Sequence, residues 1–177
     1  WLVKFEICEC LSGQKVSSDF LVEIAQENKV KLSLSAADSS RLIENEIEAY
    51  GWDPHYAKDQ PKIESDIVNL GFVLNVIENF QERVDALQGA YSLAKELLVI
   101  SVMLENNNAN TGESFQDGVL TSRKTFQKYF TPQELKQFVD EHLQEEAIAV
   151  APGVYFVFKD KVIQQQYLLS RSPVSYT

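Results

Sequence analysis

The pattern of apolar and polar positions predicts strands and helices in alternation along most of the chain. Apolar residues recur at helical spacing in four segments, 18–29, 37–49, 82–96 and 131–143. Alternating or continuous apolar runs of strand length occupy 30–35, 49–53, 66–70 and 97–104. The last run is almost wholly apolar, which is typical of a strand covered on both faces. This succession of strands and helices predicts a parallel sheet with helices on both sides.

The C-terminal part of the pattern predicts an antiparallel hairpin at the end of that sheet. Two apolar runs, 147–151 and 154–158, flank Pro152 and Gly153, a pair that favours a tight turn. We therefore predict an α/β fold of the Rossmann-like class. It is a three-layer, doubly wound, mostly parallel sheet with a C-terminal antiparallel hairpin.

Two helix starts carry capping residues. Asn79 is placed to cap the helix predicted over 82–96. Thr131 is followed by Pro132 at the first helical position and by Glu134 three residues on, which is the pattern of a capping box.

The length and composition of the chain fit one domain with a substantial core. The chain has 177 residues, of which 45% are hydrophobic. We predict an α/β domain over 31–170, after a helical or extended lead-in over 1–30. No apolar run approaches the roughly 20 residues that cross a bilayer, and the N-terminus lacks the features of a signal peptide. These features predict a cytoplasmic protein without membrane contact, and the start at Trp1 indicates a piece of a longer chain.

Residues that ligate metals are few and scattered. Cys8 and Cys10 are the only cysteines, and one residue separates them, whereas zinc-binding pairs are usually about two to four residues apart. His55 and His142 lie far apart in the sequence. We therefore predict no metal site, and thiols that stay reduced.

One basic segment stands out in a chain whose net charge is −10. Residues 120–130 hold Arg123, Lys124 and Lys128 among three aromatic residues. Such a mixture can hold phosphates and stack bases, which predicts contact with nucleic acid. The competing interpretation is a solvated helix start with an aromatic inner face. The acidic charge of the whole chain argues against broad, nonspecific binding to polyanions.

Polar residues interrupt the apolar segment 66–79, which has the sequence DIVNLGFVLNVIEN. One interpretation is a strand that stops at Leu70, after which Gly71 lets the backbone approach a ligand. In that case Asn75 and Glu78 face a crevice or cap the next helix. The other interpretation is a helix that packs around its polar residues. Ligands of open α/β sheets bind beyond the carboxyl ends of the strands, which favours the first interpretation.

The strand predicted over 49–53 ends at an acidic residue, Asp53. A carboxylate at that position can accept hydrogen bonds from both hydroxyl groups of a ribose. A turn former before Pro54 is the competing interpretation, and the residues alone leave both open.

Four segments follow one another along the chain: GWDPHY (51–56), DIVNLGFVLNVIEN (66–79), DGVLTSRKTFQKYFT (117–131) and APGVYFVFKD (151–160). In this order and at these intervals they closely resemble the DNA phosphorothioation-associated methyltransferase family. Proteins of that family are encoded beside bacterial systems that place sulfur in the DNA backbone. The resemblance implies a class I methyltransferase-like fold with S-adenosylmethionine as cofactor. It also implies DNA or proteins of the DNA phosphorothioation system as partners, with an unknown acceptor.

Carried over by position, the resemblance implies roles for four residues. Asp53 is similar to the ribose-binding acid of such enzymes. Asn69, Leu70 and Gly71 are similar to the strand end that meets the methionine part of the cofactor. The chain lacks the Asn/Asp-Pro-Pro-Tyr motif with which amino-methylating DNA enzymes hold a flipped base, so methylation of a base amino group is not supported.

The loop after the first predicted strand departs from the family. Family members have an acidic, glycine-rich loop there, whereas residues 32–40 of this chain, LSLSAADSS, contain no glycine. A Cβ makes close approach and positive φ cost about 1 kcal/mol per position. Ser35, Ala36 and Ala37 are small, so the loop weakens cofactor binding without excluding it. Asp38 is placed to substitute for the missing acid.

Two functions of different classes follow. The first is a methyltransferase that uses S-adenosylmethionine on an unknown acceptor. The second is a catalytically degenerate methyltransferase-like module that mediates interactions in a DNA modification or restriction system. A dinucleotide-binding domain ranks last, because its Gly-x-Gly-x-x-Gly loop is missing from the sequence.

Overall fold

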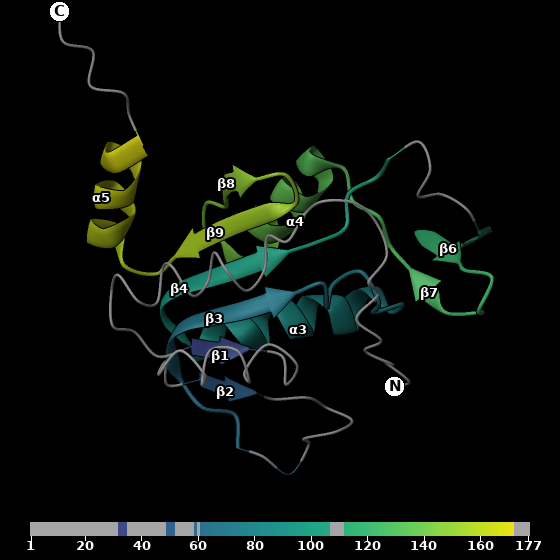
Figure 1. Cartoon of the computed structure of the whole chain (residues 1–177), viewed down its shortest axis with the longest axis horizontal. Helices are drawn as coiled ribbons and strands as arrows, with labels where there is room; N and C mark the ends of the chain where they lie inside the picture. The colour runs from purple at the N-terminus through teal and green to yellow at the C-terminus, as the bar shows by residue number, and fades with distance from the viewer. Residues whose placement is uncertain (1–31, 35–48, 52–58, 60, 107–111, 172–177) are drawn as a thin grey trace, which may run out of the picture.

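The computed structural model describes residues 32–34, 49–51, 59, 61–106 and 112–171. Its main sheet has six strands in the order β2-β1-β3-β4-β9-β8 (Figure 1). The strands β2, β1, β3 and β4 run parallel, whereas β9 runs antiparallel to both of its neighbours. Their bounds are β1 Leu32–Leu34, β2 Ala49–Gly51, β3 Ser65–Gly71, β4 Ala94–Ser101, β8 Ile148–Ala151 and β9 Val154–Phe158. This mixed sheet belongs to the α/β class that the pattern predicts.

Two helices cover one face of the main sheet. α3 (Phe80–Leu93) and α4 (Pro132–Leu143) pack against each other behind the sheet in Figure 1. The core between sheet and helices includes Leu98 from the sheet, Leu87 from α3 and Leu135 from α4. Side chains alternate between the two faces of a strand, so every second residue of β3 and β4 enters this core.

The opposite face of the sheet carries a third helix, α5 (Lys161–Arg171). The ring of Tyr167 on α5 lies 5.5 Å from the ring of Phe156 and 5.4 Å from that of Phe158. The sequence pattern predicts no element for this segment.

The bounds of β4 differ from the predicted strand 97–104. The strand starts and ends three residues earlier, since its pairing with β3 runs to Gly71 and Ser101 at the carboxyl end. Residues 94–96 fall in the helix predicted over 82–96, but they pair in the sheet instead. Pairing with a neighbouring strand outweighs local helical spacing here.

Both predicted helix caps are present. The Asn79 side-chain oxygen accepts a hydrogen bond from the backbone N–H of Glu82 at 3.1 Å. The Thr131 hydroxyl accepts one from the N–H of Glu134 at 3.1 Å, and the Glu134 carboxylate accepts one from the N–H of Thr131 at 3.4 Å. Residues within one turn of each other make these contacts, so sequence spacing predicts them.

A small antiparallel sheet occupies part of a predicted loop. It consists of β5 (Glu113–Phe115), β6 (Gly118–Leu120) and β7 (Phe126–Gln127), and it lies past the arrowheads of β3 and β4 in Figure 1. The run 105–118 is polar and without periodicity, which predicts a loop. That loop, and the helix start considered for 120–130, are wrong where these three strands lie. Strands of two or three residues show too little periodicity to be recognised from sequence.

The hairpin of β8 and β9 turns where the Pro152-Gly153 pair predicts a turn. Gly153 has a φ of +72°, which favours glycine. A Cβ at Gly153 would lie 2.5 Å from the carbonyl oxygen of Val102, so the neighbouring backbone also excludes a larger residue.

Candidate functional site at the carboxyl edge of the sheet

The order of the strands creates a candidate site at one edge of the main sheet. The chain passes from β1 to β2 on one side and then returns to β3 on the other side of β1. The direction of strand addition reverses between β1 and β3. Open α/β sheets bind ligands beyond the carboxyl ends of the strands at such a switch point. In the described residues, the parallel strands end at this edge with Leu34, Gly51, Gly71 and Ser101.

Asn69 places a polar side chain close to this edge. The residue is 8% exposed, and its Oδ1 is buried without a hydrogen-bond donor among the described residues. We call this atom the open amide oxygen. A buried polar group left without a hydrogen bond costs about 1–3 kcal/mol. The fold therefore gains no stability from it, and a ligand that donates a hydrogen bond would satisfy it.

Gly71 and Ser101 lie on the same face of the sheet as Asn69. Side chains alternate along β3, and the register pairs Asn69 with Val99 and Gly71 with Ser101. A Cβ on Gly71 would come within 3.1 Å of Asn69 Nδ2, a tight contact that the glycine avoids. The edge is therefore small and polar on the face opposite α3 and α4. Leu70, the third residue predicted here, packs in the core on the other face.

Phe72 follows this strand end with an unusual backbone conformation. Its φ is +58°, a left-handed conformation that costs a residue with a Cβ roughly 1–2 kcal/mol. Its N–H donates to the carbonyl oxygen of Ser101 at 2.7 Å. The side chain is 41% exposed. Sequence spacing does not single out Phe72, because nothing in the sequence marks a phenylalanine that adopts positive φ.

Asn75 does not face a crevice or cap a helix, so that prediction is wrong. The residue is fully buried, and its Nδ2 donates to the carbonyl oxygens of Met103 at 3.2 Å and Lys128 at 2.5 Å. Its Oδ1 accepts from the N–H of Met103 at 2.9 Å. Asn75 thus ties the loop after β3 to the segments after β4 and β7. Glu78 accepts a hydrogen bond from Gln116 Nε2 at 2.8 Å, which is also a contact to the small sheet.

A buried arginine attaches the small sheet to α3. Arg83 is 1% exposed and donates to both carboxylate oxygens of Asp117, at 2.6 and 3.2 Å. It also donates to the carbonyl oxygen of Ile77 at 2.8 and 3.1 Å. Lys128 is 7% exposed, donates to Glu134 at 2.6 Å and lies 3.9 Å from Asp117. Buried cations depend strongly on their partners, so these contacts hold the structure together.

The pKa of Asp117 reflects this environment. Partial burial raises the pKa of its carboxyl group. The hydrogen bond from Arg83 and the charges of Arg83 and Lys128 lower it more, and the net pKa is below the ordinary value. A carboxylate held ionised in this way is a weak proton acceptor, because a good general base has a pKa near the working pH. Asp117 therefore serves as an attachment point and is a poor candidate for proton transfer.

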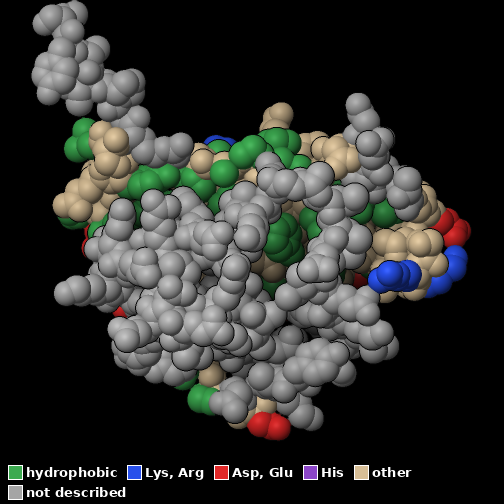
Figure 2. Space-filling model, in the orientation of Figure 1, with side chains coloured by type: hydrophobic (Ala, Val, Ile, Leu, Met, Phe, Trp, Pro, Cys, Tyr) green, Lys and Arg blue, Asp and Glu red, His purple; other side chains and the backbone are tan. Residues whose placement is uncertain are grey.

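The predicted basic cluster does not form one surface. Arg123 and Lys124 are exposed in the turn between β6 and β7. Figure 2 shows Lys and Arg side chains gathered beside acidic ones in this region, at the right of the view. Lys124 forms an exposed ion pair with Glu113 at 3.7 Å. Lys128 instead lies inside the molecule, and a phosphate contact by Lys128 would require its buried ion pairs to break.

Several predicted site residues lie outside the described residues. They include four that the sequence assigns to the cofactor: Ser35, Ala36 and Asp38 after β1, and Asp53 after β2. Because β2, β1 and β3 are parallel neighbours, the ends of β1 and β2 point to the same edge as Gly71. The roles of these four residues stay predictions. Cys8, Cys10 and His55 also lie outside the described residues.

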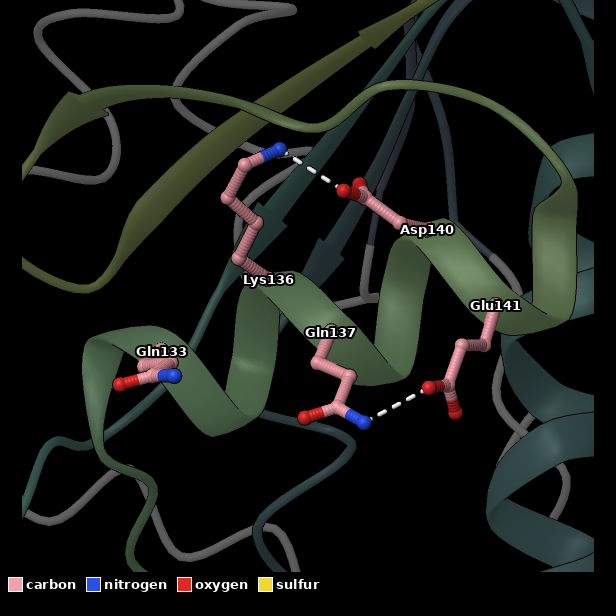
Figure 3. Close-up of a pocket in the computed structure, with 5 residues that line it drawn as sticks. All are labelled: Gln133, Lys136, Gln137, Asp140 and Glu141. Carbon is pink, nitrogen blue, oxygen red and sulfur yellow. Dashed lines mark hydrogen bonds and ion pairs between the residues drawn. The ribbon is translucent and has the colours of Figure 1, made fainter.

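The described residues offer neither a metal site nor a membrane span. They contain no group of three or more His, Cys, Asp or Glu side chains that could hold a metal ion, and no helix long and apolar enough to span a membrane. A shallow hollow of about 300 Å³ is lined by five residues of α4, Gln133, Lys136, Gln137, Asp140 and Glu141. Figure 3 shows how these side chains lie along the helix. Two pairs of these side chains bond along the helix, at 2.8 and 2.7 Å. The hollow is the solvent face of one helix, and we assign no site there.

Solved structures with the same fold are methyltransferases. The 1,6-didemethyltoxoflavin-N1-methyltransferase of Burkholderia thailandensis, solved with 1,6-didemethyltoxoflavin and S-adenosylhomocysteine, matches with a TM-score of 0.60 at 10% identity, over 81% of this chain and 77% of its own. The magnesium protoporphyrin IX methyltransferase of Synechocystis PCC 6803 matches with a TM-score of 0.54 at 10% identity. The match covers 81% of this chain and 82% of that enzyme. The CcbJ methyltransferase of Streptomyces caelestis matches with a TM-score of 0.54 at 12% identity. The match covers 85% of this chain and 98% of that enzyme.

The chain has a methyltransferase fold. This finding agrees with the Rossmann-like, class I methyltransferase-like class that the sequence implies. No protein-family model and no curated protein sequence matches the chain. Identities of 10–12% establish the fold alone, so chemistry must be argued from the residues at the carboxyl edge.

Proposed function

We propose that the chain is an S-adenosylmethionine-dependent methyltransferase-like domain that binds its cofactor at the carboxyl edge of β1 and β3. The observation that carries the proposal is the open amide oxygen of Asn69 beside Gly71 at the switch point. The methionine part of the cofactor carries an ammonium group, the kind of donor that this oxygen lacks. Gly71 leaves the backbone open to close approach. These two residues fit the methionine part of the cofactor.

The remaining contacts come from the residues predicted by sequence. Asp53 would accept hydrogen bonds from the ribose hydroxyls, and the loop with Ser35, Ala36 and Asp38 would lie along the cofactor. The bound cofactor supplies a methyl group on a positively charged sulfur. The contribution of the chain is to hold the acceptor in line with that methyl, so positioning supplies most of the rate. The acceptor stays unassigned.

Titration calorimetry with S-adenosylhomocysteine tests this site in the whole chain. We expect measurable binding at ligand concentrations below millimolar. Asn69→Leu removes the amide while keeping the side-chain size, and it should weaken binding about tenfold, since hydrogen bonds to charged groups contribute about 1.5–3 kcal/mol. The same variant should raise the free energy of unfolding by about 1 kcal/mol, because no buried polar group is left unsatisfied.

Asn79→Ala is the matched control, because Asn79 is an exposed asparagine whose side chain already has a partner, the backbone N–H of Glu82 at the start of α3. It should lose about 1 kcal/mol of stability and keep the affinity of the wild-type chain. If the wild-type protein binds no S-adenosylhomocysteine at millimolar concentration, the proposed methyltransferase function is wrong. Full affinity in Asn69→Leu would contradict the site.

The glycine-free loop over 32–40 favours a second candidate function. The chain would then be a degenerate methyltransferase-like module that lost cofactor binding and mediates interactions in a DNA modification or restriction system. Ala36→Gly combined with Ala37→Gly should create affinity for S-adenosylhomocysteine where the wild-type chain has none. If the wild-type chain already binds as tightly as this double variant, the second candidate fails.

The proposed link to DNA phosphorothioation is supported by the order of four sequence motifs between residues 51 and 160. It makes DNA, or a protein of that modification system, the partner of this domain.

A further inference from the structure

The left-handed turn at Phe72 exposes an aromatic ring that the fold could have buried. In a continued strand, Phe72 would share the face of Val68 and Leu70, which pack in the core under α3 and α4. The φ of +58° breaks this alternation and leaves the side chain 41% exposed. The chain returns to the core at Leu74, which is fully buried.

The fold bears two costs at this position, and no ring contact among the described residues offsets them. A Cβ in the left-handed region is sterically unfavourable, whereas glycine adopts this conformation freely. Exposure of the ring also forfeits the favourable burial of apolar surface. The bond that fixes the turn runs from the Phe72 N–H to the carbonyl oxygen of Ser101 at 2.7 Å, and glycine would make it equally well. The contact with Ser101 therefore requires the left-handed turn at residue 72 but does not require a phenylalanine side chain there.

Phe80 is a second exposed phenylalanine, and contacts with neighbouring rings account for its position. Phe80 is 54% exposed, but its ring packs edge-on against Phe138 at 5.8 Å and His142 at 5.6 Å, which explains its presence. Phe72 has no such ring partner among the described residues. Strained residues of this kind cluster at ligand sites, and Phe72 is next to Gly71 at the switch point.

We infer that Phe72 is a stacking surface for a planar aromatic ring of a ligand bound at the carboxyl edge. This inference rests on the proposed function, which places a ligand beside Asn69 and Gly71. The ring can come from two sources, the adenine of the cofactor or an aromatic acceptor. Both offer the same chemistry to Phe72, which is a flat face of aromatic carbon and nitrogen.

The test compares Phe72→Gly with the wild-type chain. S-adenosylhomocysteine is titrated by calorimetry. Quinoline is titrated by NMR, with and without S-adenosylhomocysteine. We expect the variant to bind a planar ring about tenfold more weakly, while its Tm stays equal or rises because the strained conformation is relieved. Phe80→Ala is the matched control, which removes another exposed phenylalanine and should keep both affinities.

The arms of the experiment separate the two sources of the ring. Weaker binding of S-adenosylhomocysteine to Phe72→Gly assigns the ring to adenine. Unchanged binding of S-adenosylhomocysteine together with weaker binding of quinoline assigns it to the acceptor. Equal affinities of both probes for Phe72→Gly and the wild-type chain overturn the inference.

Different binding results would refute the stacking surface at Phe72 and the proposed cofactor site. Wild-type protein that binds S-adenosylhomocysteine with an affinity independent of Phe72, and that binds no quinoline, refutes only the stacking surface. Wild-type protein that binds neither probe refutes both. A large loss of Tm in Phe72→Gly would show that the ring supports the fold, which also overturns the inference.

Discussion

At the scale of single residues, two buried asparagines show how tertiary contacts decide a role. Asn69 and Asn75 both interrupt the apolar segment 66–79, so the pattern treats them alike. The structure gives the side chain of Asn75 three hydrogen bonds, whereas the Oδ1 of Asn69 has no donor among the residues that the structure describes. Satisfied buried amides specify the fold, whereas an open one can accept a hydrogen bond from a ligand. Asn75 is therefore structural, and Asn69 is the candidate for binding.

Asn75→Ala should destabilise the protein by about 3 kcal/mol, because it leaves the N–H and carbonyl oxygen of Met103 and the carbonyl oxygen of Lys128 without their partner. Urea unfolding measures the change. Gln81→Ala removes an exposed hydrogen bond to Asp85 and serves as a control, with an expected change within about 0.5 kcal/mol. Equal midpoints for the two variants would refute the structural role of Asn75.

At the scale of elements, polar side chains in the turn between β5 and β6 attach the small sheet to the segment around α3. β5 and β6 are joined by the turn that holds Asp117, and this carboxylate meets the buried guanidinium of Arg83 on α3. Gln116 in the same turn donates to Glu78 before α3. The sheet is too small to have a core of its own, so it keeps its position through these contacts.

Acid should weaken this attachment. Because the pKa of Asp117 is lowered in the folded chain, its contribution to stability is present above the ordinary aspartate pKa of about 4 and is lost as the pH falls through the lowered value. Asp117→Asn should remove that part of the pH dependence and lower the stability at neutral pH. The free energy of unfolding, measured by urea titration between neutral and acidic pH, checks both effects.

Asp85→Asn is the matched control for this titration, since Asp85 is an exposed aspartate on α3, the helix that carries Arg83. It should keep the pH profile of the wild-type chain. A profile of Asp117→Asn that superimposes on the wild-type profile would show that the contact to Arg83 contributes nothing measurable.

At the scale of the whole molecule, the distribution of charge limits how the chain can meet DNA. The net charge of −10 repels a polyanion. The exposed cations Arg123 and Lys124 lie at the end of the small sheet, which itself lies past the carboxyl ends of β3 and β4 (Figures 1 and 2). A DNA contact would therefore be local, through this turn, and would depend strongly on salt.

Arg123→Ala combined with Lys124→Ala should weaken binding to a DNA duplex. It should also reduce the slope of log affinity against log salt by about 2, since each lost phosphate contact contributes about 0.9. Fluorescence anisotropy at several salt concentrations measures both, with phosphorothioate and unmodified duplexes compared. Lys95→Ala, an exposed lysine of β4, is the control and should leave the slope unchanged. Identical slopes for the double variant and the wild-type chain would remove the proposed nucleic-acid contact.

The sequence by itself determined the features that depend on neighbouring residues. The caps at Asn79 and Thr131, the strand that contains Asn69 and the turn at Gly153 follow from periodicity, side-chain spacing or the freedom of glycine. Each of these depends on contacts within a few residues, so a local pattern is sufficient to predict it.

Only the tertiary structure decided the features that depend on distant partners. Pairing with β3 set the bounds of β4, and contacts between segments far apart in sequence buried Asn75 and Lys128. The conformation of Phe72 is fixed by a bond to Ser101 on the next strand. Residue types do not encode which distant group will lie opposite them, and the same asparagine or lysine is exposed or buried according to how the chain packs.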